Sequence, residues 1–333
     1  MINAFRTLNP VNILWLGLVL IGLRVGFIIK LPDHIPFTLV EPFARLLIPV
    51  SYENIFSPLN NVLIAAVLIL GQSLWVNHII NHYNLLGKAT FLPALMYITV
   101  SSLFIPFLIL SPALICNFLV IWMVDKLLQL YADENAKATA YDLGIIVAIG
   151  TLIYFPYIYM FLAVWAGLVI FRPFNWREWV SAVVGFITIF FFLAVFYFWN
   201  DRIEQFYKIW LPLGSSFPNR IEIVNYYNYL IIIPVIVILV LAFLRLRQNF
   251  FKSYVLMRKS FQAMAFLFFI GMVSFYVKAN FNLSHFILCA VPAAIIFAYY
   301  DYIPAGKLVA AIGCHDQKEI ILVKFPIHRG HRK

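Results

Sequence analysis

Apolar runs about as long as a bilayer is thick constrain this chain more than any other feature. Hydrophobic residues make up 64% of its 333 residues, and charged residues only 11%. A soluble domain of this size cannot bury so much apolar surface, whereas lipid accepts it when every backbone polar group is hydrogen-bonded within helices. The sequence therefore predicts an all-α fold, a polytopic transmembrane helical bundle.

The apolar runs divide the chain into candidate membrane spans. The first run, residues 11–29, is too long for the core of a signal peptide and is followed by Lys30 rather than by a small-residue cleavage site, so we expect it to be retained. The other single runs are residues 59–80, 91–110, 112–124, 180–199, 229–244, 261–277 and 285–300. We expect residues 1–300 to form the transmembrane domain and residues 301–333 to form a basic cytoplasmic tail.

A proline decides the topology. Residues 143–171 form an apolar stretch that contains Pro156, so they are either one kinked span or two short spans that turn at residues 155–157. Two short spans give about ten helices and a cytoplasmic N-terminus. One kinked span gives about nine helices and an external N-terminus.

Basic residues help to choose between these arrangements because Lys and Arg collect in cytoplasmic loops. The chain has 24 Lys and Arg residues and a net charge of +10. The ten-span arrangement puts a larger majority of them inside, so it is the first choice and nine spans the second. Both arrangements leave the C-terminus in the cytoplasm. We expect a multi-pass protein of a bacterial inner membrane and no nucleic-acid partner.

Two long polar connections, residues 30–58 and 200–228, lie outside the membrane in the ten-span arrangement. Each contains apolar residues at helical spacing, which predicts an amphipathic helix at the membrane surface. In the first connection Glu41 and Arg45 are four apart and share a face. The simpler interpretation is a lid or spacer that rests on lipid; alternatively, the two connections meet over a substrate.

Arg24 is a charged residue inside the first apolar run. A guanidinium at the bilayer centre costs up to about 3 kcal/mol and usually finds a partner or an aqueous cavity. Arg24 is only six residues before Lys30, so it can snorkel toward the outer surface or pair structurally. Alternatively, it offers a bidentate clamp for a phosphate or a carboxylate.

The polar residues of the outer face supply weak candidates for a site. Asp33, His34 and Glu41 are the catalytic candidates because carboxylates and imidazoles serve as general acids and bases. Ordinary loop polarity is the simpler explanation of these residues. The candidate substrate-binding residues are Arg24, Arg45, Asp201, Glu204 and His285.

Metal and cofactor sites have little support in the sequence. His78 and His82 are four apart and share a helix face, but no third ligand is obvious, so we interpret them as part of a polar helix end and expect no metal site. Cys116, Cys289 and Cys314 show neither a disulfide framework nor a metal pattern. The sequence identifies no cofactor.

Residues 172–179, Arg-Pro-Phe-Asn-Trp-Arg-Glu-Trp, are the most distinctive short string. Pro173 suits the first turn of a helix, and the Trp and Arg side chains suit anchoring at headgroup depth. The functional alternative is a docking surface for a cytoplasmic or membrane partner. With residues 72–81 and 297–300, this string resembles an uncharacterised family of multi-pass inner-membrane proteins from Bacteroidota, over roughly residues 1–300. The resemblance implies a location and no activity.

Two functions follow as hypotheses. Sparse charge within the spans favours a noncatalytic subunit that packs against other membrane proteins in an envelope assembly. The alternative is a membrane glycosyltransferase-like enzyme, or a transporter, that handles a lipid-linked or anionic substrate at the outer face. The paired acidic motif of such glycosyltransferases is not evident here. Whether the chain is an enzyme is left open.

Overall fold

The computed structural model describes residues 5–32, 57–208, 210, 236, 240, 255–274 and 283–302. These residues form helices and connections without a strand, which confirms the predicted all-helical fold for them. Several predictions fall outside them: the amphipathic stretch of residues 33–56 with Asp33, His34, Glu41 and Arg45, most of the run 229–244, and the tail.

Six helices of the described part are long and apolar enough to cross a membrane: α1 (Val11–Ile29), α3 (Pro58–His82), α5 (Pro112–Gln129), α6 (Ala136–Ile153), α8 (Trp176–Trp199) and α11 (Val255–Val273). The shorter elements are α4 (Leu92–Val100), η3 (Ile105–Phe107), η4 (Phe155–Tyr159), α7 (Met160–Phe171), α9 (Ile203–Lys208), η8 (Leu283–Cys289) and α12 (Ala290–Tyr302).

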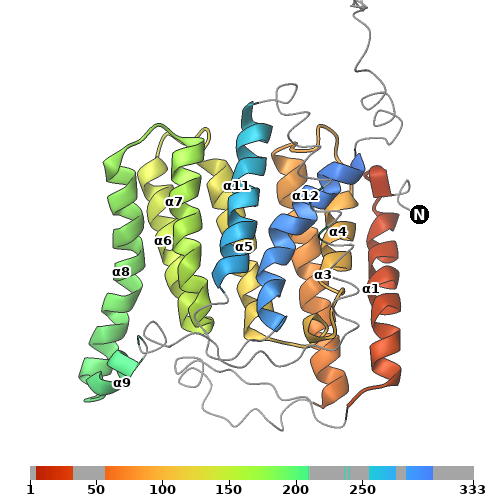
Figure 1. Ribbon diagram of the computed structural model, residues 1–333, viewed down its shortest axis with the longest axis horizontal. Helices are drawn as coiled ribbons and strands as arrows, with labels where there is room; N and C mark the ends of the chain where they lie inside the picture. The colour runs from red at the N-terminus through yellow and green to blue at the C-terminus, as the bar shows by residue number, and fades with distance from the viewer. Residues whose placement is uncertain are drawn as a thin grey trace, which may run out of the picture.

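The long helices stand side by side, with α8 at one edge of the bundle and α1 at the other (Figure 1). We call the end with residues 83–91, 130–135 and 172–175 the upper end, and the end with residues 101–111, 154–159 and 200–202 the lower end, as they lie in Figure 1. Between the edges, α6 packs on α8 and α5, α11 packs on α7, and α12 packs on α4.

The first helix joins the bundle through a narrow stripe. Its buried residues are Asn12, Leu16, Leu20 and Arg24, each four after the last. Residues four apart lie on one helix face, so most of the remaining apolar side chains of α1 point away from the bundle. Many of them are exposed, as are those on the outer face of α8, which is compatible with contact with lipid.

Residues 90–110 run back along α3 although only nine of them form the α4 helix. The Asn81 side chain binds both backbone groups of Thr90: its Nδ2 donates to the carbonyl oxygen at 2.9 Å, and its Oδ1 accepts the N–H at 3.1 Å. Asn61 Oδ1 accepts the Leu110 N–H at 2.8 Å. Asn61 and Asn81 are twenty residues apart, or about 30 Å along a helix. Two asparagine side chains therefore hold this segment at opposite ends of α3.

The stretch interrupted by Pro156 is two helices that run in opposite directions. α6 ends at Ile153, η4 contains Pro156, and α7 leads back to the upper end. Arg172, directly after α7, donates to the carbonyl oxygens of Leu130 and Asp133, which precede α6. The chain therefore returns to the end from which it started, as the two-span alternative requires.

Two glycines allow α6 and α8 to pack backbone against backbone. A Cβ atom at Gly144 would collide with the Ala182 carbonyl oxygen, and one at Gly185 with the Tyr141 carbonyl oxygen. Small residues at such a crossing let helices approach closely in a membrane. The edge helix α8, with few buried residues of its own, depends on this contact.

We expect Gly185→Ala to destabilise the chain by about 1 to 3 kcal/mol because the added methyl group separates α6 from α8. The measurement is thermal unfolding of the detergent-purified protein. Gly26→Ala is the matched control, since a Cβ atom there meets nothing within 4 Å. Equal unfolding temperatures for the two variants would contradict the proposed role of the crossing.

Candidate functional site

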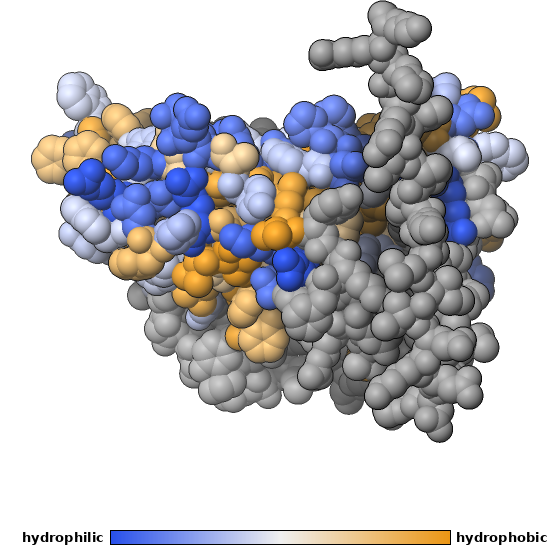
Figure 2. All heavy atoms as spheres, turned by 90° about the horizontal axis from the view of Figure 1, so that it is seen from above, coloured by the Kyte–Doolittle hydropathy of each residue, from blue (hydrophilic) through white to orange (hydrophobic). Residues whose placement is uncertain are grey.

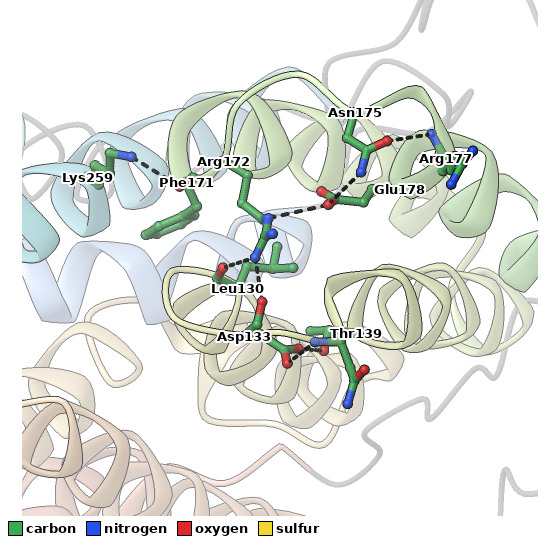
Figure 3. Close-up of polar contacts among 10 residues, drawn as sticks. Leu130, Asp133, Thr139, Phe171, Arg172, Asn175, Arg177, Glu178 and Lys259 are labelled. Atoms are coloured by element: carbon green, nitrogen blue, oxygen red, sulfur yellow. Dashed lines mark hydrogen bonds and ion pairs between the residues drawn. The ribbon is translucent and has the colours of Figure 1, made fainter.

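Polar side chains from two connections and three helices meet at the upper end, in what we call the upper cluster: Asp133, Thr139, Arg172, Asn175, Glu178 and Lys259 (Figure 3). Arg172 lies at its centre. Its Nη1 donates to the Leu130 oxygen at 3.3 Å and to the Asp133 oxygen at 2.6 Å, and its Nε lies 3.4 Å from Glu178 Oε1. One guanidinium thus joins the α5–α6 connection, the end of α7 and the first turn of α8.

The start of α8 is fixed by its own sequence. Asn175 caps the helix, since its Oδ1 accepts the Arg177 N–H and its Nδ2 donates to Glu178 Oε1 at 3.2 Å. Glu178 is only 3% exposed, although it is charged. Its ion pair with Arg172 and the cap explain why a carboxylate is tolerated there.

Two lysines tie neighbouring elements together at the upper end. Lys259 of α11 donates from Nζ to the Phe171 oxygen at 3.0 Å and lies 5.5 Å from the centre of the Tyr131 ring. Lys126 of α5 forms an ion pair of 2.8 Å with Asp142 of α6. The upper end is therefore cross-linked by basic side chains from α5, α11 and the α7–α8 connection.

The pKa of Asp133 is lowered, chiefly because Thr139 donates a hydrogen bond to its carboxylate. The Asn135 N–H and the charges of Arg172 and Lys126 act in the same direction, while partial burial opposes them. Each favourable contact stabilises the ionised form, which therefore persists to lower pH. Asp133 serves here to order the connection before α6.

A cavity of about 520 Å³ opens beside the cluster, with Tyr83, Tyr131, Asp133, Glu134 and Leu256 among its lining residues. Burial, helped by nearby Asp125, raises the pKa of the Tyr83 phenol to about 12. The phenol therefore remains neutral at physiological pH and acts only as a hydrogen-bonding group.

Two of the three aromatic residues in the distinctive string 172–179 are exposed, whereas Trp179 stacks on Trp165. Phe174 is 77% exposed and Trp176 61% exposed, and Arg177 beside them is also exposed. Figure 2 shows this end from above, with hydrophilic side chains gathered toward the α6–α8 edge and apolar ones among them. These three side chains form what we call the outward triplet, and they fit either headgroup anchoring or docking.

Arg24, a predicted substrate-binding residue, is buried rather than extended toward the surface. It is 1% exposed, and its Nη1 donates to the Val62 oxygen at 2.9 Å and to the Leu108 oxygen at 3.1 Å. Leu108 directly follows η3 in the segment between α4 and α5. The guanidinium therefore fastens α1 to α3 and to a break in helical structure.

His285, also predicted to bind substrate, is 3% exposed inside the lower half. Its Nδ1 lies 2.8 Å from the Tyr154 hydroxyl, and its Nε2 lies 2.9 Å from Ser274 Oγ and 3.1 Å from the Gly271 oxygen. Ser274 donates its own hydrogen to Gly271. A neutral imidazole with its proton on Nε2 satisfies every one of these contacts. His285 thus joins η4, α11 and η8.

A second buried network, of Gln72, Tyr97 and Asn117, was missed by the sequence analysis. Tyr97 donates to Gln72 at 2.7 Å, Gln72 donates to the Leu114 oxygen, and Asn117 donates to Tyr97 and to the Ile287 oxygen. Gln72 and Asn117 are amides inside apolar helices, and that signal was available in the sequence. Their carbonyl partners, Leu114 and Ile287, could not be predicted from the sequence.

The remaining predicted residues do not join a common site. Asp201 and Glu204 are exposed beside and within α9, at the edge of the bundle opposite Arg24 (Figure 1). The rings of His78 and His82 stack with centres 6.1 Å apart. Among the residues that the structure describes, no group of three or more His, Cys, Asp or Glu side chains is placed to hold a metal ion.

Residues 34–312 match the model of a family of unknown function, DUF6427. The match covers most of the chain and confirms the predicted resemblance to an uncharacterised family. No curated protein and no solved structure matches the chain.

We expect Thr139→Val to raise the pKa of Asp133 toward its ordinary value of 3.8, because the largest cause of its lowering is removed. A carboxyl whose folded pKa is lowered stabilises the fold above its unfolded pKa, and this stability is lost as pH falls through the folded pKa. Thr139→Val should therefore unfold at a lower temperature than the wild type at pH 7. The difference in unfolding temperature between the two proteins should become smaller below pH about 4.

Thr139→Ser, which keeps the hydroxyl, is the control and should follow the wild type. If Thr139→Val and the wild type differ in unfolding temperature by the same amount at pH 7 and below pH about 4, the role assigned to the Asp133 carboxylate is contradicted.

Proposed function

The chain belongs to DUF6427, a family of unknown function, and we propose that it is a noncatalytic subunit of an assembly in a bacterial inner membrane. In this proposal the helices make about ten crossings, with the upper end in the cytoplasm. The shorter segments formed by α4 with η3, η4 with α7, and η8 with α12 each make one crossing. The crossing between the lower end at α9 and the upper end at α11 is assigned to the apolar run 229–244 from its sequence, since most of this run lies outside the described residues.

The distribution of charge supports this orientation because cytoplasmic loops are rich in Lys and Arg. In the described part of the chain, more basic residues lie at the upper end than at the lower end. Those at the upper end are Arg6, Lys88, Lys126, Lys137, Arg172, Arg177, Arg258 and Lys259, and those at the lower end are Lys30, Arg202 and Lys208.

The outward triplet carries the proposal of a subunit. Phe174, Trp176 and Arg177 are exposed on a backbone that Arg172, Asn175 and Glu178 hold in place. Aromatic and arginine side chains dominate the binding energy of protein interfaces, and a rigid backbone reduces the entropy lost on binding. The buried polar residues also favour a noncatalytic role. The side chains of Arg24, Gln72 and Asn117 donate to backbone carbonyl oxygens, so they serve to hold the helices together.

The test is photocrosslinking in cells from benzoylphenylalanine placed at position 174 or 177. We expect both positions to capture one and the same protein, and we expect Trp176→Ala to reduce that product several-fold at normal abundance. Position 192, on the exposed apolar face of α8, is the control and should give no such product. A chain that purifies alone, and whose triplet variants behave as the wild type in cells, would contradict the subunit role.

A second candidate function is an enzyme or transporter that handles a lipid-linked or anionic substrate at the lower, outer face. It is favoured by helix interruptions at residues 101–111, η4 and η8, which all lie in the lower half. Transporters often form substrate sites at broken helices. Alanine at Arg24, Asp33 or Glu41 should then abolish function in a strain that needs the protein, at unchanged abundance, whereas full activity would remove this candidate.

A further inference from the structure

The Arg24 side chain is held by one nitrogen. Nη1 donates to both the Val62 and the Leu108 carbonyl oxygens, so the plane of the guanidinium is fixed between α3 and the segment before α5. Neither carbonyl carries a full charge. The positive charge of Arg24 is therefore solvated by two dipoles but not neutralised by them.

The two other nitrogens of Arg24, Nε and Nη2, are buried and have no hydrogen-bond partner among the residues that the structure describes. These two atoms form one edge of the guanidinium, and their N–H bonds point in the same direction. A pair of parallel donors matches two oxygens of a phosphate or a carboxylate, which is the bidentate arrangement that arginine favours.

Charge neutralisation within the described chain is not available to Arg24. The ion pairs found there, Lys126 with Asp142 and Arg172 with Glu178, both lie at the upper end. A buried cation without an anion is costly in a membrane, and such residues usually mark a binding site or a pathway. An anion that enters from the lower end removes this cost.

We propose that the Nε–Nη2 edge of Arg24 binds a phosphate group at the lower end of the bundle. Arg24 is six residues before Lys30, about 9 Å along α1, so in the proposed membrane placement it lies about 9 Å inward from the lower headgroup layer. Exposed apolar residues occupy the other faces of α1, so a phospholipid can rest its chains there while its phosphate extends around the lower end of the helix to the buried guanidinium. The site rests on the proposed membrane placement and not on the subunit role.

The phosphate has two possible sources, a lipid headgroup or free phosphate, and a titration of the full-length protein in a neutral detergent separates them. The probes are dioleoylphosphatidylglycerol, dioleoylglycerol, which has the same chains without phosphate, and inorganic phosphate. The readouts are the unfolding temperature and the number of bound lipids in native mass spectra. Stabilisation by phosphatidylglycerol alone identifies a lipid, and equal stabilisation by inorganic phosphate identifies the free ion.

Two variants test the edge itself. Arg24→Gln keeps an amide donor for the two carbonyls but removes the edge and the charge, and Arg24→Lys keeps the charge but removes the edge. We expect each to weaken phosphate binding about tenfold or more. Lys30→Gln is the control for general attraction between a basic surface and an anion, and it should change binding by less than about threefold.

Three results would overturn the proposal: equal binding of dioleoylglycerol and phosphatidylglycerol, equal losses in Arg24→Gln and Lys30→Gln, or unchanged binding in both Arg24 variants. A fourth would do so as well. If only the double variant Asp33→Asn, Glu41→Gln binds phosphate, a carboxylate of the chain itself occupies the edge. Each result is obtained with purified protein, so a failure here leaves the crosslinking test of the subunit role intact.

Discussion

The Arg172 guanidinium determines how the second half of the bundle is arranged. It connects the carbonyl oxygens of Leu130 and Asp133, before α6, to Glu178 in the first turn of α8. These contacts close the α6–α7 hairpin at the upper end and fix where α8 begins. Removing the arginine would leave a nearly buried carboxylate without its counter-charge, which is far more costly than the loss of an exposed ion pair. The direction in which α8 leaves the upper end follows from this closure.

A second constraint explains where the polar residues lie. Backbone groups released by a break in a helix cannot bond to water inside a membrane, so side chains must satisfy them. Asn61 accepts the Leu110 N–H, Arg24 binds the Leu108 oxygen, and Asn117 binds the Ile287 oxygen. Each of these backbone partners lies in, or next to, an interrupted segment. Among the described residues, these buried polar side chains therefore hold broken helices, and the Nε–Nη2 edge of Arg24 remains free for the proposed ligand.

The long helices were predictable from the sequence because apolar length determines them. The run 11–29 matches α1, and the run 180–199 lies within α8. The predicted helix boundaries were wrong where polar residues continue a helix. α11 begins at Val255, six residues before the apolar run 261–277, because its first turns contain the charged residues Arg258 and Lys259. The run 91–110 contains only a short α-helix, because its second half is held by side chains of α3 and α1 rather than by its own ladder.

The candidate sites were predictable only in part. The cost of a charge in an apolar run identified Arg24, but its partners, Val62 and Leu108, are 38 and 84 residues away. The string 172–179 was recognised by composition, whereas the contact between Arg172 and the residues before α6 depends on the hairpin. No local pattern encodes such contacts, and for the same reason Pro156 alone did not decide between one span and two.

The most direct measurement is the side of the membrane reached by reporters inserted at Glu134 and at Phe174, the exposed positions that flank the α6–α7 hairpin. Two reporters are used at each position, one that is active only in the cytoplasm and one that is active only in the periplasm, so that each position is assigned to one side of the membrane. The hairpin closed by Arg172 predicts that both positions lie on the same side, in the cytoplasm. Opposite sides for the two positions would show that residues 136–171 cross the membrane once, and would contradict the arrangement described here.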